Sequence, residues 1–255
     1  MEAHSVDLWR VSLHPGMDRL RDLWKCLDRD ERTRAFRFRF PRDRDRFVAS
    51  RGTLRHILAH RLGLAPERLR FGQGPAGKPF LPDHADLWFN VSHAGELLLI
   101  GLAHHGPLGV DVEVVQEDAV VDATGPLVLS QPERDELSRL EGPARRERFA
   151  RFWTRKEAYI KADGRGMSLE LGRIDVSGGG DRALLRDPSS GRWTPCERWT
   201  LRSLDAWPGY AAAVAAEGDG WRLVRHGWSE GPGSDSRSGS TQPNRASTDI
   251  SRSLV

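Results

Sequence analysis

Two acidic residues alternate with valines in the segment GVDVEV, residues 109–114. Successive side chains of a β-strand point to opposite faces, so Asp111 and Glu113 share one face while the valines pack on the other. Two neighbouring carboxylates repel each other unless a positive charge lies between them, and a hard divalent cation with oxygen ligands is the usual solution. A half-buried strand whose acidic face meets water would show the same pattern, so the segment alone leaves both interpretations open.

A second set of residues recurs every four positions in FWTRKEAYIK, residues 152–161. Trp153, Glu157 and Lys161 therefore form one stripe of a predicted helix, with Lys156 beside them. A third carboxylate with two ammonium groups suits a metal and phosphate site, because magnesium supplies charge to phosphoryl oxygens while lysines hold the rest of the anion. The simpler alternative is a surface ion pair between Glu157 and Lys161, with Trp153 in the core.

Two shorter motifs lie in the first half of the chain. In FNVSH, residues 89–93, a predicted strand ends at a turn where Ser92 and His93 can donate hydrogen bonds to phosphate oxygens, although a hairpin cap is the ordinary explanation. In GPAGKP, residues 74–79, a rigid turn presents Lys78 without the pattern of a Walker loop. Neither motif decides a function by itself.

The elements that must position these residues can be traced along the chain. Residues 46–62 have apolar side chains at helical spacing, and Gly63 suits the C-terminal cap of that helix. Short apolar runs bounded by turn residues follow, and they predict an antiparallel meander: 69–71, 87–91, 96–103 and 108–115.

The second half repeats the order of helices followed by strands. Ser130 with Glu133 three residues later has the form of a capping box, and a longer helix should run from about residue 144 to 161 and end at Gly164. Alternating stretches around residues 174, 184, 201, 212 and 223 predict further strands. We therefore expect an α+β protein of two similar halves with antiparallel sheets, over residues 1–115 and 116–228.

The last residues differ in composition. Residues 229–255 contain eight serines and no aromatic residue, so they cannot bury enough apolar surface to offset the entropy of ordering. We expect this segment to be a disordered tail.

Cysteine content and hydropathy limit the class of protein. Only Cys26 and Cys196 occur among 255 residues, without metal-ligand spacing, which gives little support to a disulfide framework or a zinc site. The N-terminus lacks the pattern of a signal peptide, and the longest apolar run, residues 97–103, is too short to span a bilayer. We expect a cytoplasmic protein that does not enter a membrane.

Basic charge is concentrated in residues 29–55, which hold ten arginines and four acidic residues. Such a segment favours an anionic partner, and phosphate, an acidic protein and nucleic acid all satisfy that condition. A solvated helix face with Arg–Asp pairs is the simpler alternative.

The four motifs taken together are more specific than any one of them. In chain order, GKP, FNVSH, GVDVE and FWTRKEAYIK resemble the signatures of the long, Sfp-type 4′-phosphopantetheinyl transferases, from about residue 31 to 166. The resemblance implies a monomer of two similar α+β halves with the active site between them. It also implies an enzyme, a holo-[acyl-carrier-protein] synthase of the phosphotransferase class, that moves the phosphopantetheine arm of coenzyme A to a serine of a carrier protein and releases 3′,5′-ADP.

The resemblance also implies roles for individual residues. Asp111, Glu113 and Glu157 would hold Mg²⁺, or Mn²⁺, bound to the coenzyme A pyrophosphate, and Glu157 would take the proton of the acceptor serine. Further residues would contact coenzyme A: Arg34 near the 3′-phosphate, Lys78, Ser92, His93, Lys156 and Lys161. Of these, Lys161 and His93 would also be catalytic, because they would contact the phosphates. Arg32, Arg37 and Arg39 compete with Arg34 for its role.

The implied partners are coenzyme A and apo acyl or peptidyl carrier proteins of fatty acid, polyketide or nonribosomal peptide biosynthesis. Two rival functions use some of the same residues. A magnesium-dependent hydrolase of coenzyme A or of a nucleotide pyrophosphate would use the same carboxylates. A basic nucleic-acid-binding module would use the arginines, but without metal its acidic residues would repel phosphate. We therefore expect no nucleic acid partner.

Overall fold

The structure is a computed structural model that describes residues 4–74, 77–166, 169–186, 190–205 and 207–227. The tail expected from residue 229 onward lies outside the described residues. Within them, the α-helices are α1 (Met17–Lys25), α2 (Arg29–Phe36), α3 (Pro41–Leu62), α4 (Asp118–Val128), α5 (Gln131–Leu137) and α6 (Gly142–Asp163). The strands are β1 (Ser5–Ser12), β2 (Gly72–Gln73), β3 (Pro79–Phe80), β4 (Trp88–Ala94), β5 (Leu97–Ala103), β6 (Leu108–Val114), β7 (Ile174–Asp175), β8 (Leu184–Arg186), β9 (Trp193–Pro195), β10 (Trp199–Leu204), β11 (Tyr210–Glu217) and β12 (Arg222–His226).

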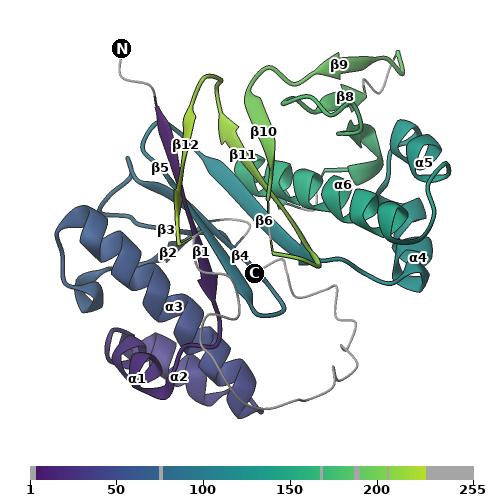
Figure 1. The fold of residues 1–255 in the computed structure, drawn as a ribbon. Coiled ribbons are helices and arrows are strands. Elements are labelled where there is room, and N and C mark those ends of the chain that lie inside the picture. Colours follow the sequence, from purple (N-terminus) through teal and green to yellow (C-terminus); the bar gives the residue numbers. More distant parts are fainter. Residues whose placement is uncertain (1–3, 75–76, 167–168, 187–189, 206, 228–255) are drawn as a thin grey trace.

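Two main sheets form the centre of the molecule, and each contains a strand from the other half of the chain. One has the order β12-β1-β5-β4 and the other the order β10-β11-β6. The late strand β12 runs parallel to β1, with Ser5 opposite Arg222, and the early strand β6 is antiparallel to β11, with Asp111 opposite Ala213. The two halves are therefore similar in plan but exchange strands (Figure 1).

The predicted meander is confirmed in part. Strands β4 and β5 form the expected antiparallel hairpin, but residues 69–71 precede the short strand β2 instead of forming a strand of their own. Strand β6 pairs with β11 and not with β5. The reason is that β1 and β4 already occupy both edges of β5, so no hydrogen-bonding edge remains there for β6.

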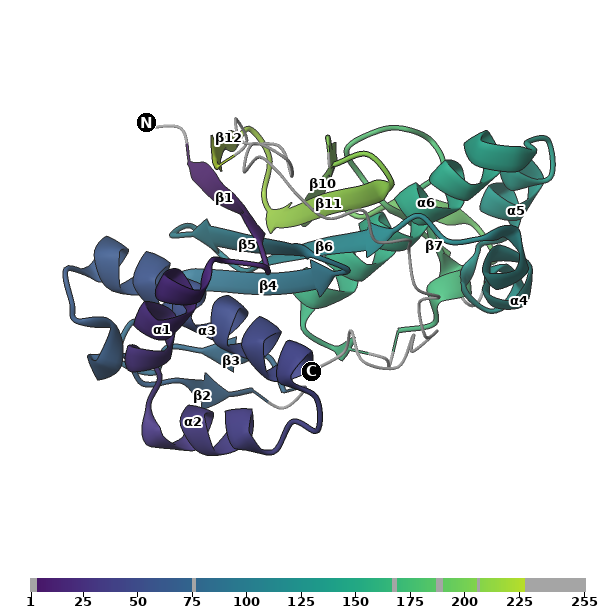
Figure 2. The same ribbon diagram turned by 60° about the horizontal axis from the view of Figure 1, so that its bottom comes forward.

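Helices cover the sheets in two groups. Figure 2 shows α1, α2 and α3 together on one side of β4 and β5, while α4, α5 and α6 lie at the other end of the molecule. The first group packs through Leu23 and Leu58 against the buried face of β5. The second packs through Phe152 and Tyr159 against β10 and β11. A third cluster, which includes Val110, joins strands of both halves. Apolar packing therefore joins the two halves at these strands.

The same helical arrangement appears twice, and this similarity supports the two-half architecture. Helices α3 and α6 each have 22 residues, and each ends at a glycine with left-handed backbone, Gly63 at φ 65° and Gly164 at φ 81°. Both endings agree with the sequence prediction, although α3 begins earlier than expected. The shorter helices α2 and α5 each begin with a capping box.

A buried ion pair fastens each short helix to its long partner. The capping-box residue Glu31 accepts a hydrogen bond from Arg55 of α3 at 2.6 Å, and the equivalent Glu133 lies 2.5 Å from Nζ of Lys156 on α6. Both cations are fully buried, at 0% exposed. Removing one partner of such a pair would leave an uncompensated buried charge, which is strongly destabilising.

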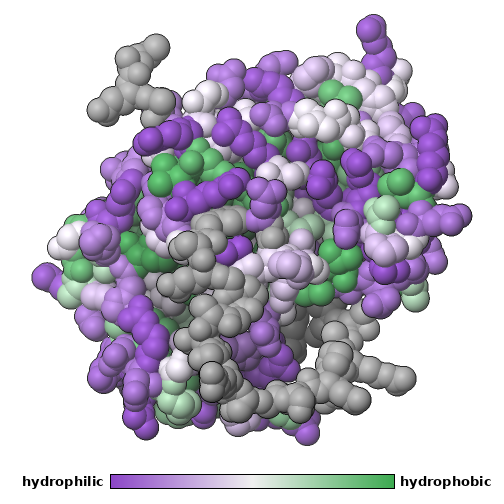
Figure 3. All heavy atoms as spheres, in the orientation of Figure 1, coloured by the Kyte–Doolittle hydropathy of each residue, from purple (hydrophilic) through white to green (hydrophobic). Residues whose placement is uncertain are grey.

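The outer surface is mainly hydrophilic on the face that Figure 3 displays, with scattered apolar patches. No helix in the described ranges combines the length and apolar character that crossing a lipid bilayer requires. Both cysteines are free, as the sequence indicated.

Candidate active site

The backbone of α6 lies directly against β6 because Gly109 has no side chain. A β-carbon at this position would lie 2.1 Å from the carbonyl oxygen of Ala158 and 2.4 Å from the nitrogen of Ala162. Contacts this short are sterically forbidden, so only glycine permits the approach. The first residue of GVDVE thereby brings the acidic strand and the helix with the third carboxylate together.

Asp111 and Lys161 form the centre of the resulting cluster. The Lys161 Nζ atom lies 2.7 Å from Asp111 Oδ1 and donates a hydrogen bond to Ser92 Oγ at 3.0 Å. The Ser92 hydroxyl in turn donates to Asp111 Oδ1 at 2.9 Å. Strands β4 and β6 and helix α6 therefore each contribute one side chain to a single hydrogen-bonded group.

The stripe predicted on the helix faces the same cluster. The indole nitrogen of Trp153 donates to Glu113 Oε1 at 3.2 Å, while Glu157 is buried at 2% exposed. We define Asp111, Glu113 and Glu157, together with Lys161, as the carboxylate cluster.

Burial and mutual repulsion disturb the protonation of the cluster. Burial first, and then the charge of Asp111, raise the pKa of Glu113 to about 8. The same two causes, in the same order, raise the pKa of Glu157 to about 7. Burial disfavours the charged form of Lys161, but the three carboxylates outweigh it and raise its pKa. The cluster thus contains more negative charge than one lysine neutralises.

Two buried carboxylate oxygens lack hydrogen-bond partners among the described residues, Asp111 Oδ2 and Glu157 Oε2. An unpaired buried acceptor costs free energy and commonly marks a place for an ion or a ligand. No three His, Cys, Asp or Glu side chains within the described ranges are already close enough together to hold a metal ion. The charges of the three carboxylates act on one another, but their side chains as described do not form a ready metal-binding group.

Two further residues from the shorter motifs, Lys78 and His93, lie close enough to Lys161 for its charge to act on them. Lys78 donates to the backbone oxygens of Leu108 and Lys161, each at 2.7 Å, and so links the start of β6 to the end of α6. Burial and the nearby Lys161 ammonium lower the pKa of Lys78 to about 8. His93 as a whole residue is exposed to solvent. Surrounding protein atoms nevertheless disfavour the charged imidazole, and this burial effect, followed by the charge of Lys161, lowers the pKa of His93.

Lys156 does not join the cluster. Its ammonium group contacts Glu133 and donates to the carbonyl oxygens of Val128 and Leu171, at 2.7 and 2.9 Å. These three contacts use all three of its hydrogen atoms. In this structure these contacts fasten α5 to α6, and the expected contact of Lys156 with coenzyme A stays a prediction.

Arg34 lies on α2, away from β6 and α6. Its guanidinium carbon sits 5.2 Å above the ring of Phe47, and the side chain is exposed. It has no ion pair with any residue that the structure describes. Arg32, one of its competitors, donates to the carbonyl oxygen of Lys25 at 2.8 Å.

Two positioning residues were missed by the sequence analysis. The sequence predicts Gly109 only as a member of the GVDVE motif, and Asn90 is not among the predicted site residues. The Asn90 side chain accepts a hydrogen bond from the backbone nitrogen of Val110 at 2.8 Å, and so holds β4 against β6. A glycine directly before alternating carboxylates was the available signal for close backbone approach.

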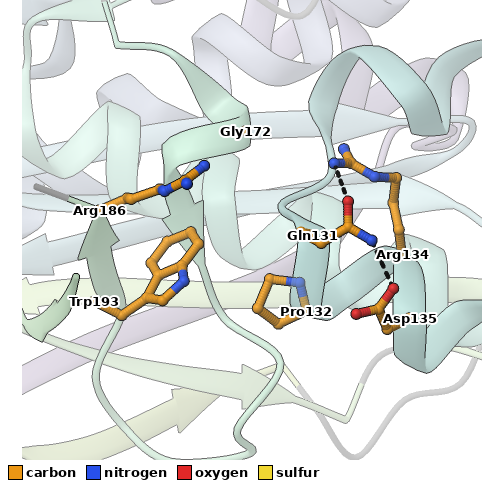
Figure 4. A pocket seen from close by; sticks show the side chains of 7 residues that line it. All are labelled: Gln131, Pro132, Arg134, Asp135, Gly172, Arg186 and Trp193. Atoms are coloured by element: carbon orange, nitrogen blue, oxygen red, sulfur yellow. Dashed lines mark hydrogen bonds between the residues drawn. The ribbon is translucent and has the colours of Figure 1, made fainter. Parts of the chain in front are cut away.

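A hollow of about 440 Å³ lies elsewhere, between the start of α5 and strands β8 and β9. Figure 4 shows Gln131 bridging Arg134 and Asp135, with Trp193 facing them across the hollow. None of the residues of the carboxylate cluster lines it. The chemistry that the cluster supports is therefore not located in this hollow.

Comparison with known proteins agrees with the motifs. Residues 107–215 match the sequence model of the 4′-phosphopantetheinyl transferase superfamily, and residues 11–105 match that of the 4′-phosphopantetheinyl transferase N-terminal region. The 4′-phosphopantetheinyl transferase HetI of Nostoc is 34% identical over 85% of this chain and 90% of its own length. The 4′-phosphopantetheinyl transferase Sfp of Bacillus subtilis is 27% identical over 73% of this chain and 80% of its own.

A solved holo-(acyl-carrier-protein) synthase from Bacillus anthracis aligns with 44% of this chain and 96% of its own, at 22% identity and a TM-score of 0.34. That likeness is too distant to add to the argument. The identity and coverage of HetI, together with the two matching sequence models, establish that this chain is an enzyme of the 4′-phosphopantetheinyl transferase superfamily.

Proposed function

We propose that the chain transfers the 4′-phosphopantetheine arm of coenzyme A to a serine of apo acyl or peptidyl carrier proteins, with Mg²⁺ as cofactor and 3′,5′-ADP as the product released. The observation that carries the proposal is the carboxylate cluster. Its three acidic residues come from β6 and α6 and all act on the charge of Lys161, and two of their buried oxygens have no partner among the described residues.

The donor set fits a hard divalent cation. All the candidate ligand atoms are carboxylate oxygens, which Mg²⁺ and Mn²⁺ prefer. The raised pKa values of Glu113, about 8, and Glu157, about 7, indicate a site that gains stability from added positive charge. Asp111, Glu113 and Glu157 would hold the ion, which would supply charge to the pyrophosphate oxygens of coenzyme A.

Glu157 is the proposed proton acceptor. It would take the proton from the acceptor serine hydroxyl, directly or through a water molecule, as the serine oxygen forms its bond to the β-phosphorus and the bond to 3′,5′-ADP breaks. Positioning and charge stabilisation supply most of the catalysis in phosphoryl transfer of this kind.

The remaining cluster residues would bind coenzyme A. Lys161 and His93 donate to its phosphates, and the lowered pKa of His93 makes the ring a neutral donor at neutral pH. Lys78 uses two hydrogen atoms within the protein, which leaves one for the ligand. Ser92 would line the coenzyme A site, and Arg34 would meet the 3′-phosphate with an exposed guanidinium.

The proposed partner is an acidic carrier domain that approaches the arginine-rich residues 29–55. Opposite charges on the two surfaces would speed association. We further propose that the enzyme acts in the cytoplasm as a monomer, since one chain contains both halves, and that nucleic acid is not among its partners.

The decisive test is mass spectrometry of apo carrier proteins after incubation with coenzyme A and Mg²⁺. Transfer adds the phosphopantetheine mass to serine, and Asp111→Asn or Glu157→Gln should slow it by about 10²-fold or more, because each removes charge from the reacting centre. Glu147→Gln, an exposed position on the same helix, is the matched control and should keep the full rate.

Two results would refute the proposal. One is transfer at the unaltered rate by both cluster variants. The other is release of pantetheine phosphate from coenzyme A at an equal rate without any carrier, which would identify a hydrolase instead.

A further inference from the structure

A strongly basic hollow lies on the side of α6 that faces away from the carboxylate cluster. Its volume is about 290 Å³, and its lining includes Arg148, Arg151 and Arg155 of α6 and Arg202 of β10. The three helical arginines are spaced three, four and seven residues apart, so they project from one face of the helix. No residue of the carboxylate cluster lines this hollow.

Positive charge in the hollow is poorly compensated. Asp181 is the one acidic residue among the lining residues that the structure describes, and it lies 3.8 Å from Arg202 with 62% of its side chain exposed. Arg148 pairs at 3.0 Å with Glu136, which is not part of the lining. The side chain of Arg151 has no hydrogen bond or ion pair to any residue in the described ranges. The lining therefore contains four guanidinium groups and one carboxylate, while Glu136 pairs with Arg148 from outside the lining and Arg202 also donates a hydrogen bond to the Trp221 carbonyl oxygen at 3.0 Å.

Arg155 forms the buried part of the hollow. Only 4% of the residue is exposed, and its Nε atom has no hydrogen-bond partner within the part of the chain that the structure describes. Its other nitrogens contact the carbonyl oxygen of Gly180 and, at 3.5 Å, the hydroxyl of Ser203. Burying a guanidinium without a carboxylate partner is costly, and an anion in the hollow would offset that cost.

We propose that this hollow is a second anion-binding site, which takes an oxyanion of phosphate size, either inorganic phosphate or the phosphate group of a small phosphomonoester. Guanidinium groups bind phosphate oxygens in a bidentate manner. The volume of about 290 Å³ lies at the lower end of the ~300–1,000 Å³ usual for ligand pockets.

The test is calorimetric titration of the full chain with inorganic phosphate and, in a parallel arm, with glycerol 3-phosphate. The tighter binder of the two identifies the source of the phosphate group. Sodium chloride at about 0.15 M in every titration screens nonspecific attraction between exposed charges. Binding should weaken by about tenfold or more in Arg151→Ala and Arg155→Met, since each variant removes a charge-assisted hydrogen bond.

Two controls locate the binding event. Arg139→Ala removes an exposed arginine outside the hollow, and Lys161→Ala removes the ammonium group of the carboxylate cluster. Both should leave the affinity within about twofold of the unaltered chain, as expected for distant sites. Arg151 is exposed, so Arg151→Ala decides the test alone if Arg155→Met fails to fold.

Weakened binding in either folded hollow variant, with both controls unchanged, supports the proposal. Unchanged binding in the hollow variants, or loss of binding in Lys161→Ala alone, would mean that phosphate binds at the carboxylate cluster and would overturn it. Absence of binding by both anions to the unaltered chain would also overturn it. In that case slower carrier modification by Arg151→Ala would identify this face as a protein-docking surface.

Discussion

Replacing Gly109 by alanine should separate the two elements that build the carboxylate cluster. The added β-carbon would lie 2.1 Å from the Ala158 carbonyl oxygen, whereas ordinary contact begins at 3.4 Å. Strand and helix must therefore move apart by roughly 1.3 Å to relieve the overlap. The 2.7 Å contact between Lys161 and Asp111 would then lengthen to roughly 4 Å, beyond hydrogen-bond range.

Both stability and transfer should respond to this displacement. Overpacking of a close contact typically costs roughly 1–3 kcal/mol of unfolding free energy. A misplacement of about 1 Å at a reacting centre can slow catalysis by about 10²-fold. Urea unfolding measures the first effect, and mass spectrometry of a carrier protein under saturating coenzyme A measures the second.

Gly178→Ala is the matched control for this variant. Gly178 has nothing within 4 Å of the added carbon and no left-handed backbone, so its stability should change by less than about 0.5 kcal/mol. If Gly109→Ala unfolded at the same urea concentration as the unaltered chain and transferred at the same rate, the close approach of α6 to β6 would not be what holds the cluster together.

Three further outcomes follow from the charged groups. Without divalent cations, the unfolding free energy should fall as pH rises from about 4.5 through 7, because the raised pKa of Glu157 lets the folded chain hold a proton that the unfolded chain has released. Glu157→Gln should then be more stable than the unaltered chain by roughly 1–3 kcal/mol at about pH 8.5 in urea unfolding, and equal stability there would contradict the assigned burial. Lys156→Met should cost about 3–5 kcal/mol by leaving Glu133 unpaired, and the double variant with Glu133→Gln should recover part of that loss in the same assay. The rate with an acidic carrier should fall several-fold between about 50 and 300 mM salt, and a rate independent of salt would exclude steering by residues 29–55.

Much of the local structure was predictable because short-range signals determine it. The capping box at Ser130, the left-handed glycine at 164 and the alternation of Asp111 with valines each reflect a requirement of the backbone within a few residues. These signals predict α5, the end of α6 and strand β6, and the structure confirms all three.

Long-range pairing was not predictable in the same way. Nothing in the sequence of β6 distinguishes β5 from β11 as its neighbour, since the choice depends on β1 occupying the free edge of β5. The orientation of Lys156 has the same kind of origin. Helical spacing put it beside Glu157, but the buried carboxylate of Glu133 draws it to the other side of α6.

The candidate cluster itself was expected from motif residues, and the structure brings Asp111, Ser92 and Lys161 into direct contact. The roles assigned to these residues in coenzyme A and metal binding stay predictions until the variants are measured. The contribution of Gly109 became evident only from the distance between two backbones, a quantity that no spacing within one segment contains.

The parallel pairing of β1 with β12 joins the first and the last of the described strands. During synthesis on the ribosome β12 emerges after every other described strand, so one edge of β1 has no neighbour until then. Cutting the gene between β6 and α4 would yield two fragments, each lacking a strand that the other supplies. Such fragments should aggregate through their open edges when expressed singly and regain a soluble fold only when expressed together.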